Sequence, residues 1–207
     1  MLLDPVLAFV LFLVACYFGS NVFTPVRFDR EKIEVWVADG QIQVRGLYRY
    51  RNRFPLPLSF SLGLPFPIDA AHPAPSVFSI AEVTADGASL KDITPRNYHD
   101  GIVFRLWFAP QQEKWIRVDY VQSAFRPEGR YILMTTRKWN RPLDFGEYIL
   151  HLPGGSELAT SNYELQTKLG EQERRYSFWR SNFYPGEDWE FSWKTPVPLA
   201  ASDRTSR

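Results

Sequence analysis

The sequence predicts a mainly β protein, an antiparallel β-sandwich preceded by one hydrophobic N-terminal helix. Apolar and polar residues alternate along most of the 207-residue chain, and a period of two places the apolar side chains on one face of a strand. Aromatic residues make up 16% of the chain, which also has 16 prolines, and this composition favours strands and turns. Turn signals recur about every eight to twelve residues, as in sandwich domains.

The composition divides the chain into three parts. Residues 1–23 are predicted to be a membrane anchor or signal segment, and residues 24–195 a single β-sandwich domain. Residues 196–207 are small, polar and charged, which predicts a disordered tail.

Residues 5–23 contain no Asp, Glu, Lys, Arg or His. As a helix this segment would rise roughly 28 Å, close to the thickness of the hydrocarbon core of a bilayer. It therefore predicts contact with a membrane through an uncleaved anchor. A cleaved signal peptide and a lipoprotein carrying lipid on Cys16 are the alternatives, since Leu13-Val14-Ala15-Cys16 resembles a lipobox. Either alternative would usually require a basic residue near the N-terminus, where this chain has Asp4 instead.

Two signals conflict on the orientation in the membrane. Arg27, Arg30 and Lys32 follow the segment, and counting bases would place the domain in the cytoplasm. The abundance of Trp and Tyr and the lack of nucleotide-binding motifs favour an extracytoplasmic, periplasmic domain. We adopt the second interpretation.

Cysteine, histidine and net charge limit the possible chemistry. Cys16 is the only cysteine and lies in the hydrophobic segment, so neither an intrachain disulfide nor a cysteine metal site is expected. His72, His99 and His151 match no zinc-binding spacing. The net charge is +1, which gives no bulk attraction to nucleic acid. We expect no cofactor and no nucleic-acid partner.

Asp39-Gly40 is the strongest hairpin signal, because a type I′ turn requires positive φ at both central positions. It separates predicted strands at 33–38 and 42–52. One face of the second strand carries Ile42, Val44, Gly46, Tyr48 and Tyr50, and the other carries Arg45, Arg49 and Arg51. We expect the first face to be buried.

The remaining strands are predicted from alternation and from the turns that bound them. They cover residues 57–66, 77–84, 88–92, 102–108, 115–122, 131–137, 147–152, 163–169, 174–183 and 189–194. Prolines indicate loops at 67–75 and 95–101. Turns are predicted at Asp86-Gly87, from its Asp-Gly pair, and at 126–129.

Two basic clusters are the candidate interaction surfaces. The first is Arg45, Arg49 and Arg51, which would contact an acidic partner or anionic lipid headgroups. Its alternative is a solvated face paired across strands with acidic or aromatic residues. The second cluster comprises Arg137, Lys138, Trp139 and Arg141. There Trp139 is also interpretable as a core residue beside a solvated turn.

These features predict a non-enzymatic accessory or interaction module of a cell-envelope complex, with a protein partner. One alternative is a glycan- or headgroup-binding module that uses the aromatic residues between Tyr176 and Trp193. Another is a hydrolase using His99 and Asp100, although an Asp-Gly turn also explains Asp100. Segments 48–52, 64–67 and 131–142 resemble exported bacterial β-domains but no single family, so no functional residue is transferred.

Overall fold

A computed structural model describes residues 24–170 and 173–195. The segment 5–23, Cys16 and the predicted tail lie outside these residues.

The prediction of a mainly β protein is confirmed. The described strands and one 3₁₀ helix are β1 (Val26–Ala38), β2 (Gln41–Asn52), β3 (Leu58–Pro65), β4 (Val77–Val83), β5 (Ser89–Asp92), β6 (Arg96–Tyr98), β7 (Gly101–Phe108), β8 (Glu113–Ser123), β9 (Glu128–Tyr131), η1 (Met134–Trp139), β10 (Leu143–Pro153), β11 (Glu157–Ser161), β12 (Gln166–Leu169), β13 (Glu173–Phe183) and β14 (Trp189–Lys194). Within these ranges, no helix is long and apolar enough to cross a bilayer.

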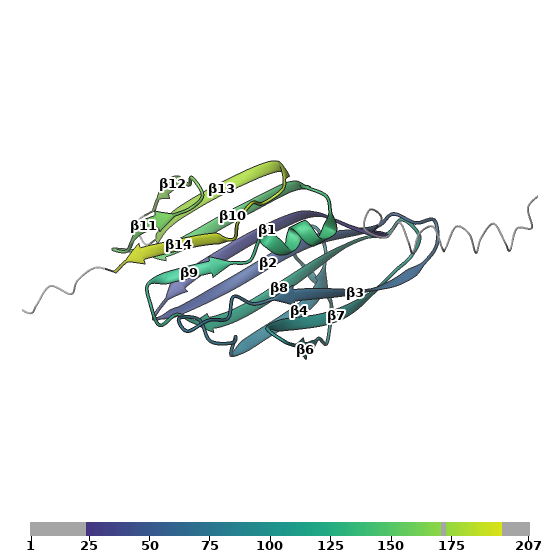
Figure 1. Ribbon diagram of the computed structural model, residues 1–207, viewed down its shortest axis with the longest axis horizontal. Coiled ribbons are helices and arrows are strands. Elements are labelled where there is room, and N and C mark those ends of the chain that lie inside the picture. The colour runs from purple at the N-terminus through teal and green to yellow at the C-terminus, as the bar shows by residue number, and fades with distance from the viewer. Residues whose placement is uncertain (1–23, 171–172, 196–207) are drawn as a thin grey trace, which may run out of the picture.

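An eight-stranded sheet forms one layer, in the order β12-β13-β10-β1-β2-β8-β4-β5 (Figure 1). Its strands pair antiparallel except β1 and β10, which are parallel. The expectation of purely antiparallel pairing is therefore wrong at this position. The chain leaves β8, passes through β9 and η1 over the sheet, and returns as β10. Parallel strands require a crossover of this kind.

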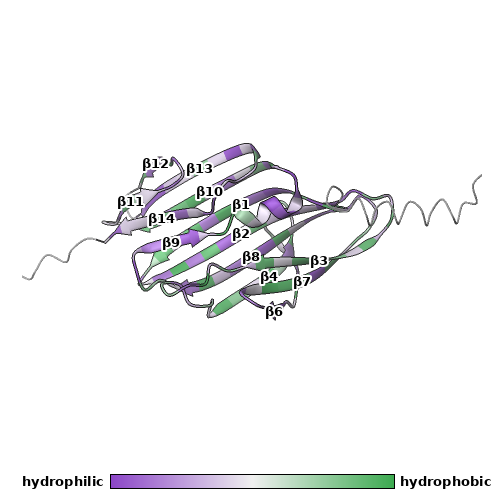
Figure 2. Ribbon diagram, viewed as in Figure 1, coloured by the Kyte–Doolittle hydropathy of each residue, from purple (hydrophilic) through white to green (hydrophobic). Residues whose placement is uncertain are grey.

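Two three-stranded sheets, β11-β14-β9 and β3-β7-β6, lie over one face of the large sheet (Figure 1). The core fills the space between the layers, and hydrophobic residues alternate with hydrophilic ones along its strands (Figure 2). Trp189, Phe191 and Trp193 all face this core and are at most 6% exposed. Alternation along β14 places the three rings on one buried face of that strand.

The predicted β1–β2 hairpin is confirmed. Asp39 and Gly40 have φ values of 48° and 72°, and Ala38 pairs with Gln41 across the turn. In β2 the predicted apolar face is buried against the second layer. Local turn chemistry therefore fixed the register of the two strands at the centre of the sheet.

The strand predicted at 131–137 is wrong except at its first residue. β9 ends at Tyr131, and η1 begins at Met134. The Asp188 carboxylate accepts hydrogen bonds from the backbone N–H groups of Leu133 and Met134, at 2.9 and 3.0 Å. This distant acid satisfies amides at the start of the helix, which favours a helical turn over an extended chain.

Three short strands were not predicted. β6 lies in a segment expected to be a loop, β9 begins within a predicted turn, and β11 falls between two predicted strands. Each has at most five residues, and each pairs with a longer strand of the second layer. Such short segments carry too little alternation to be recognised.

Candidate functional site

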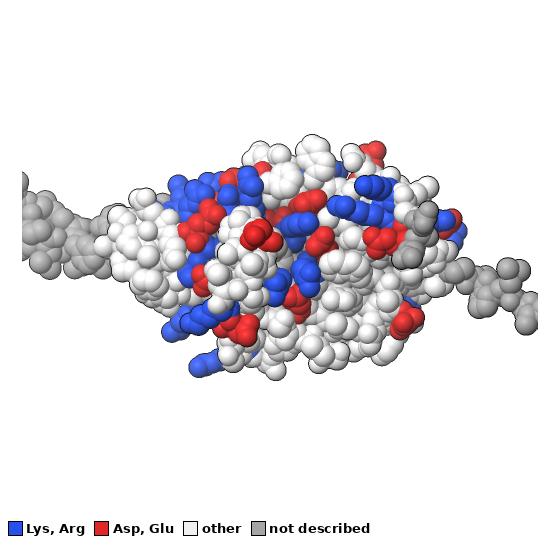
Figure 3. Space-filling view, turned by 180° about the vertical axis from the view of Figure 1, so that it is seen from behind, with Lys and Arg blue, Asp and Glu red and all other residues white. Residues whose placement is uncertain are grey.

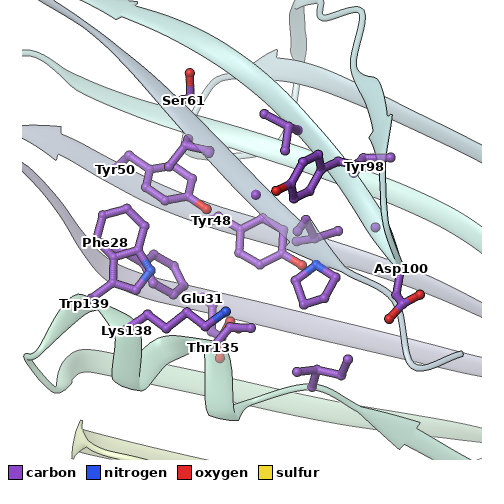
Figure 4. A pocket seen from close by; sticks show the side chains of 18 of the residues that line it. Phe28, Glu31, Tyr48, Tyr50, Ser61, Tyr98, Asp100, Thr135, Lys138 and Trp139 are labelled. Carbon is purple, nitrogen blue, oxygen red and sulfur yellow. The ribbon is translucent and has the colours of Figure 1, made fainter.

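A cavity of about 500 Å³ lies between the two layers (Figure 4). β1 and β2 contribute residues from the large sheet, β3 lines one side, and η1 lines the other. The turn between β6 and β7 also contributes. In Figure 4, Tyr48 and Tyr50 come from the large sheet, whereas Lys138 and Trp139 come from η1. The sequence analysis did not identify this site.

Aromatic rings form the apolar wall of the cavity. The ring of Trp139 lies 5.8 Å from that of Phe28, and 5.9 Å from each of Tyr50 and Phe60. The rings of Phe28 and Tyr50 stack at 5.2 Å. This wall presents flat, polarisable surface, which suits an aromatic, aliphatic or cationic ligand group.

The polar part of the site centres on Glu31, which is 4% exposed. The Tyr148 hydroxyl donates a hydrogen bond to Glu31 Oε1, and the hydroxyls of Tyr48 and Tyr131 are 2.9 Å apart. Burial raises the pKa of Glu31 to about 7, against the opposing effect of the Tyr148 hydrogen bond. Burial and the nearby Glu31 raise the pKa of all three tyrosines well above the usual value. The hydroxyls therefore stay protonated while Glu31 titrates near neutrality.

Two glycines make room for the tyrosine rings. Gly46 and Gly146 each precede a tyrosine by two residues and share its face of the strand. A Cβ atom on Gly46 would lie 2.1 Å from the Tyr48 hydroxyl oxygen, and one on Gly146 would lie 2.6 Å from that of Tyr148. Both rings thus fold back over a glycine. This explains why glycine occupies a buried strand position.

Replacing Gly46 with alanine should destabilise the fold by about 1–3 kcal/mol. The new methyl group would displace the Tyr48 ring and break its hydrogen bond to Tyr131. Urea denaturation of the full-length protein in a non-ionic detergent measures this effect. Gly63→Ala is the control, because its Cβ would meet only Val103 Cγ2, at 3.9 Å. Equal destabilisation by the two substitutions would contradict the role of Gly46.

The second basic cluster is divided between several environments. Lys138 and Trp139 line the cavity. The Arg137 guanidinium instead lies 5.0 Å from the centre of the Tyr184 ring. Arg141 is close enough to Arg53 for its charge to affect the pKa of that residue. Half of the predicted cluster therefore belongs to the cavity, with Trp139 in its wall.

Arg45, Arg49 and Arg51 lie on the opposite face of the large sheet from the cavity. Each has a carboxylate beside it: Asp119 at 2.6 Å, Asp29 at 2.6 Å and Glu113 at 3.0 Å, respectively. Acidic and basic residues are interspersed over this face (Figure 3). This agrees with the alternative of cross-strand pairing, and contact with a partner here stays a prediction.

His99 and Asp100 form the turn between β6 and β7 at the edge of the cavity. The His99 ring packs edge-on against Tyr98, with 4.3 Å between ring centres. Within residues 24–170 and 173–195, no hydrogen bond joins His99 to a serine or carboxylate, and no cluster of metal-binding side chains is found. The structure thus places the pair at the edge of the cavity, and the hydrolase alternative stays an untested prediction.

Most of the C-terminal aromatic residues are in the core. Tyr176, Phe178, Phe183, Trp189, Phe191 and Trp193 are all buried. Trp179 and Tyr184 are 54% and 44% exposed, respectively. A glycan-stacking surface built on the C-terminal strands would depend on these two side chains.

Glu31 was missed, although the sequence contains a signal for it. Its position is two residues before Ile33, so it continues the buried face of β1. The predicted strand began only at Ile33, two residues too late to include Glu31. An acid in register with a buried face is the pattern that would have found the site.

Comparison with known proteins supports the fold but gives no family. No family model matches the sequence, and no curated protein matches it. A candidate nutrient-binding protein from Legionella pneumophila subsp. pneumophila str. Philadelphia 1 is similar over 84% of this chain and 68% of its own, with 16% identity and a TM-score of 0.64. An M1 zinc metallopeptidase from Deinococcus radiodurans matches 84% of this chain and 44% of its own, with 9% identity and a TM-score of 0.47. At 16% identity, the match to the Legionella protein shows a shared β-domain fold and nothing more.

Proposed function

We propose that this protein is a membrane-anchored, extracytoplasmic binding domain that serves a cell-envelope complex without catalysing a reaction, and that the cavity holds its ligand. The observation that carries the proposal is the buried Glu31 beside an aromatic cavity. A volume of about 500 Å³ falls within the usual range for small-molecule sites, about 300–1,000 Å³. The hydrophobic segment 5–23 supports the anchoring.

The chemistry of the cavity favours a small ligand with an apolar body and a cationic or hydrogen-bond-donating group. Phe28, Phe60 and Trp139 would contact the apolar body. A positive group beside Glu31 would favour the ionised carboxylate, offsetting the effect of burial on its pKa. Aromatic faces add to the attraction for a cation. The fold match to a candidate nutrient-binding protein supports a binding role.

Calorimetric titration of the full-length protein in lipid nanodiscs tests the proposal. The probes are 2-phenylethylamine and its uncharged counterpart 2-phenylethanol, with empty nanodiscs as the blank. We expect the amine to bind more tightly than the alcohol. Glu31→Gln should weaken the amine by about tenfold, because a charge-assisted contact is lost.

Two leucine substitutions test whether binding occurs in the cavity. Leu64 lines the cavity from the buried face of β3, and Leu158 is also partly buried against the core but lies outside the cavity. Leu64→Trp should occupy the cavity and reduce binding, whereas Leu158→Trp should leave it unchanged. Equal binding by these two variants would exclude the cavity as the site.

A further inference from the structure

Two neighbouring loops form one end of the molecule, and we call them the tip. They are residues 53–57 between β2 and β3, and residues 109–112 between β7 and β8. Apart from Arg53, their sequences, Arg-Phe-Pro-Leu-Pro and Ala-Pro-Gln-Gln, contain no charged residue. Leu56 is 57% exposed. Seen from behind, the left end of the domain, where the described chain begins, is uncharged, and basic side chains gather beside it (Figure 3).

The tip is held in a fixed shape by Asn52, which is fully buried. The Asn52 side-chain amide donates hydrogen bonds to the carbonyl oxygens of Leu56 and Ala109, at 2.9 and 2.8 Å. Its side-chain oxygen accepts one from the Phe54 N–H at 2.8 Å. Both loops are thereby tied to β2. The exposure of Leu56 is thus a property of a supported loop.

Arg53 and Arg141 provide positive charge at this end. In the part of the chain that the structure describes, neither has an ion-pair partner. The pKa of Arg53 is lowered, most of all by partial burial. The positive charges of the neighbouring Arg141, Arg27 and Arg51 lower it further. Anions placed here would relieve this repulsion between like charges.

The tip lies where the described chain begins. Val26, the first residue of β1, pairs with Asn52 at the base of the tip. Thr24 follows directly after the hydrophobic segment 5–23. An anchor that ends at Phe23 would therefore hold this end of the domain at the bilayer surface. The opposite end, where β12 meets β13 at Leu169, would point away.

We infer that the tip rests in the headgroup layer of a membrane containing anionic lipid. Leu56 enters the apolar boundary, and Arg53 and Arg141 pair with the phosphates of anionic headgroups. The inference depends on the anchoring in the proposed function, and it adds an orientation: the tip faces the bilayer and the rest of the large sheet stands away from it. An apolar group flanked by bases is the combination that interfacial binding requires.

The experiment uses full-length protein carrying Cys16→Ser, reconstituted into phosphatidylcholine vesicles with or without phosphatidylglycerol. A polarity-sensitive fluorophore is attached at Leu56→Cys. Leu169→Cys is the matched control, because Leu169 is also highly exposed, at 72%, and lies at the opposite end. We expect a blue-shifted emission and quenching by spin-labelled lipid at position 56, enhanced by phosphatidylglycerol, and neither effect at position 169.

Arg53→Gln combined with Arg141→Gln should lower the ratio of bound to free tip about 25-fold on anionic vesicles, since each base near such a surface contributes about fivefold. The protein could associate with vesicles while the fluorophore at position 56 shows the same water-exposed emission as the one at position 169. This result would overturn the inference and leave the anchoring intact. Protein that does not associate with vesicles would overturn the anchoring itself, and the inference with it.

Discussion

Replacing Glu31 with glutamine will stabilise the folded protein at alkaline pH and have little effect in acid. The Glu31 pKa is about 7 in the folded state, compared with an ordinary value of 4.5. The folded state therefore binds the proton more tightly than the unfolded state. The stability associated with the protonated carboxyl is fully present below pH 4.5 and is lost as the pH rises through about 7.

Glutamine escapes this loss because it does not ionise, and it still offers an oxygen to the Tyr148 hydroxyl. We expect the substitution to raise the free energy of unfolding by about 3 kcal/mol above about pH 8. Urea denaturation of the full-length protein in detergent, followed by tryptophan fluorescence between about pH 4 and pH 9, measures the difference.

Glu34→Gln is the matched control, since Glu34 is on the same strand but on the other face, with Lys32 at 3.4 Å. Its effect should stay below about 1 kcal/mol and should not grow as the pH passes neutrality. If the Glu31→Gln and wild-type proteins have parallel stability curves over this range, Glu31 is not the buried titrating group that the structure indicates.

Replacing Asn52 with alanine will destabilise the protein by about 3 kcal/mol. The substitution removes three hydrogen bonds: those that the Asn52 amide donates to the carbonyls of Leu56 and Ala109, and the one that its side-chain oxygen accepts from the Phe54 N–H. The Ala109 carbonyl keeps the hydrogen bond from the Gln112 N–H, at 3.2 Å. The substitution should also loosen the tip, so the fluorophore at position 56 should report greater mobility. Chemical denaturation and fluorescence anisotropy measure the two effects.

Gln112→Ala provides the comparison for Asn52. The Gln112 side chain accepts one hydrogen bond, from the Ala109 N–H at 2.8 Å, and it is only partly buried. Its removal should cost about 1 kcal/mol. A loss of stability in Asn52→Ala no larger than this would show that Asn52 does not join the two loops.

The site could be predicted from the sequence only in part. Tyr48, Tyr50 and Gly46 were assigned to the correct face of β2, because alternation in a strand is a local property. The same alternation would have placed Glu31 on the buried face of β1. Trp139 was recognised as a possible core residue, but its position against Phe28 and Phe60 depends on η1, which Asp188 stabilises from far along the chain.

The sequence by itself determined most of the longer strands, the β1–β2 hairpin and the hydrophobic character of 5–23. Side-chain alternation, turn residues and apolar length act over a few neighbouring residues, so they can be read from a single chain. Tertiary structure alone decided the parallel pairing of β1 with β10, the helical turn at η1 and the cavity between the layers. These depend on contacts between residues far apart in sequence, and the raised pKa of Glu31 depends on them too, because burial is a property of the assembled layers.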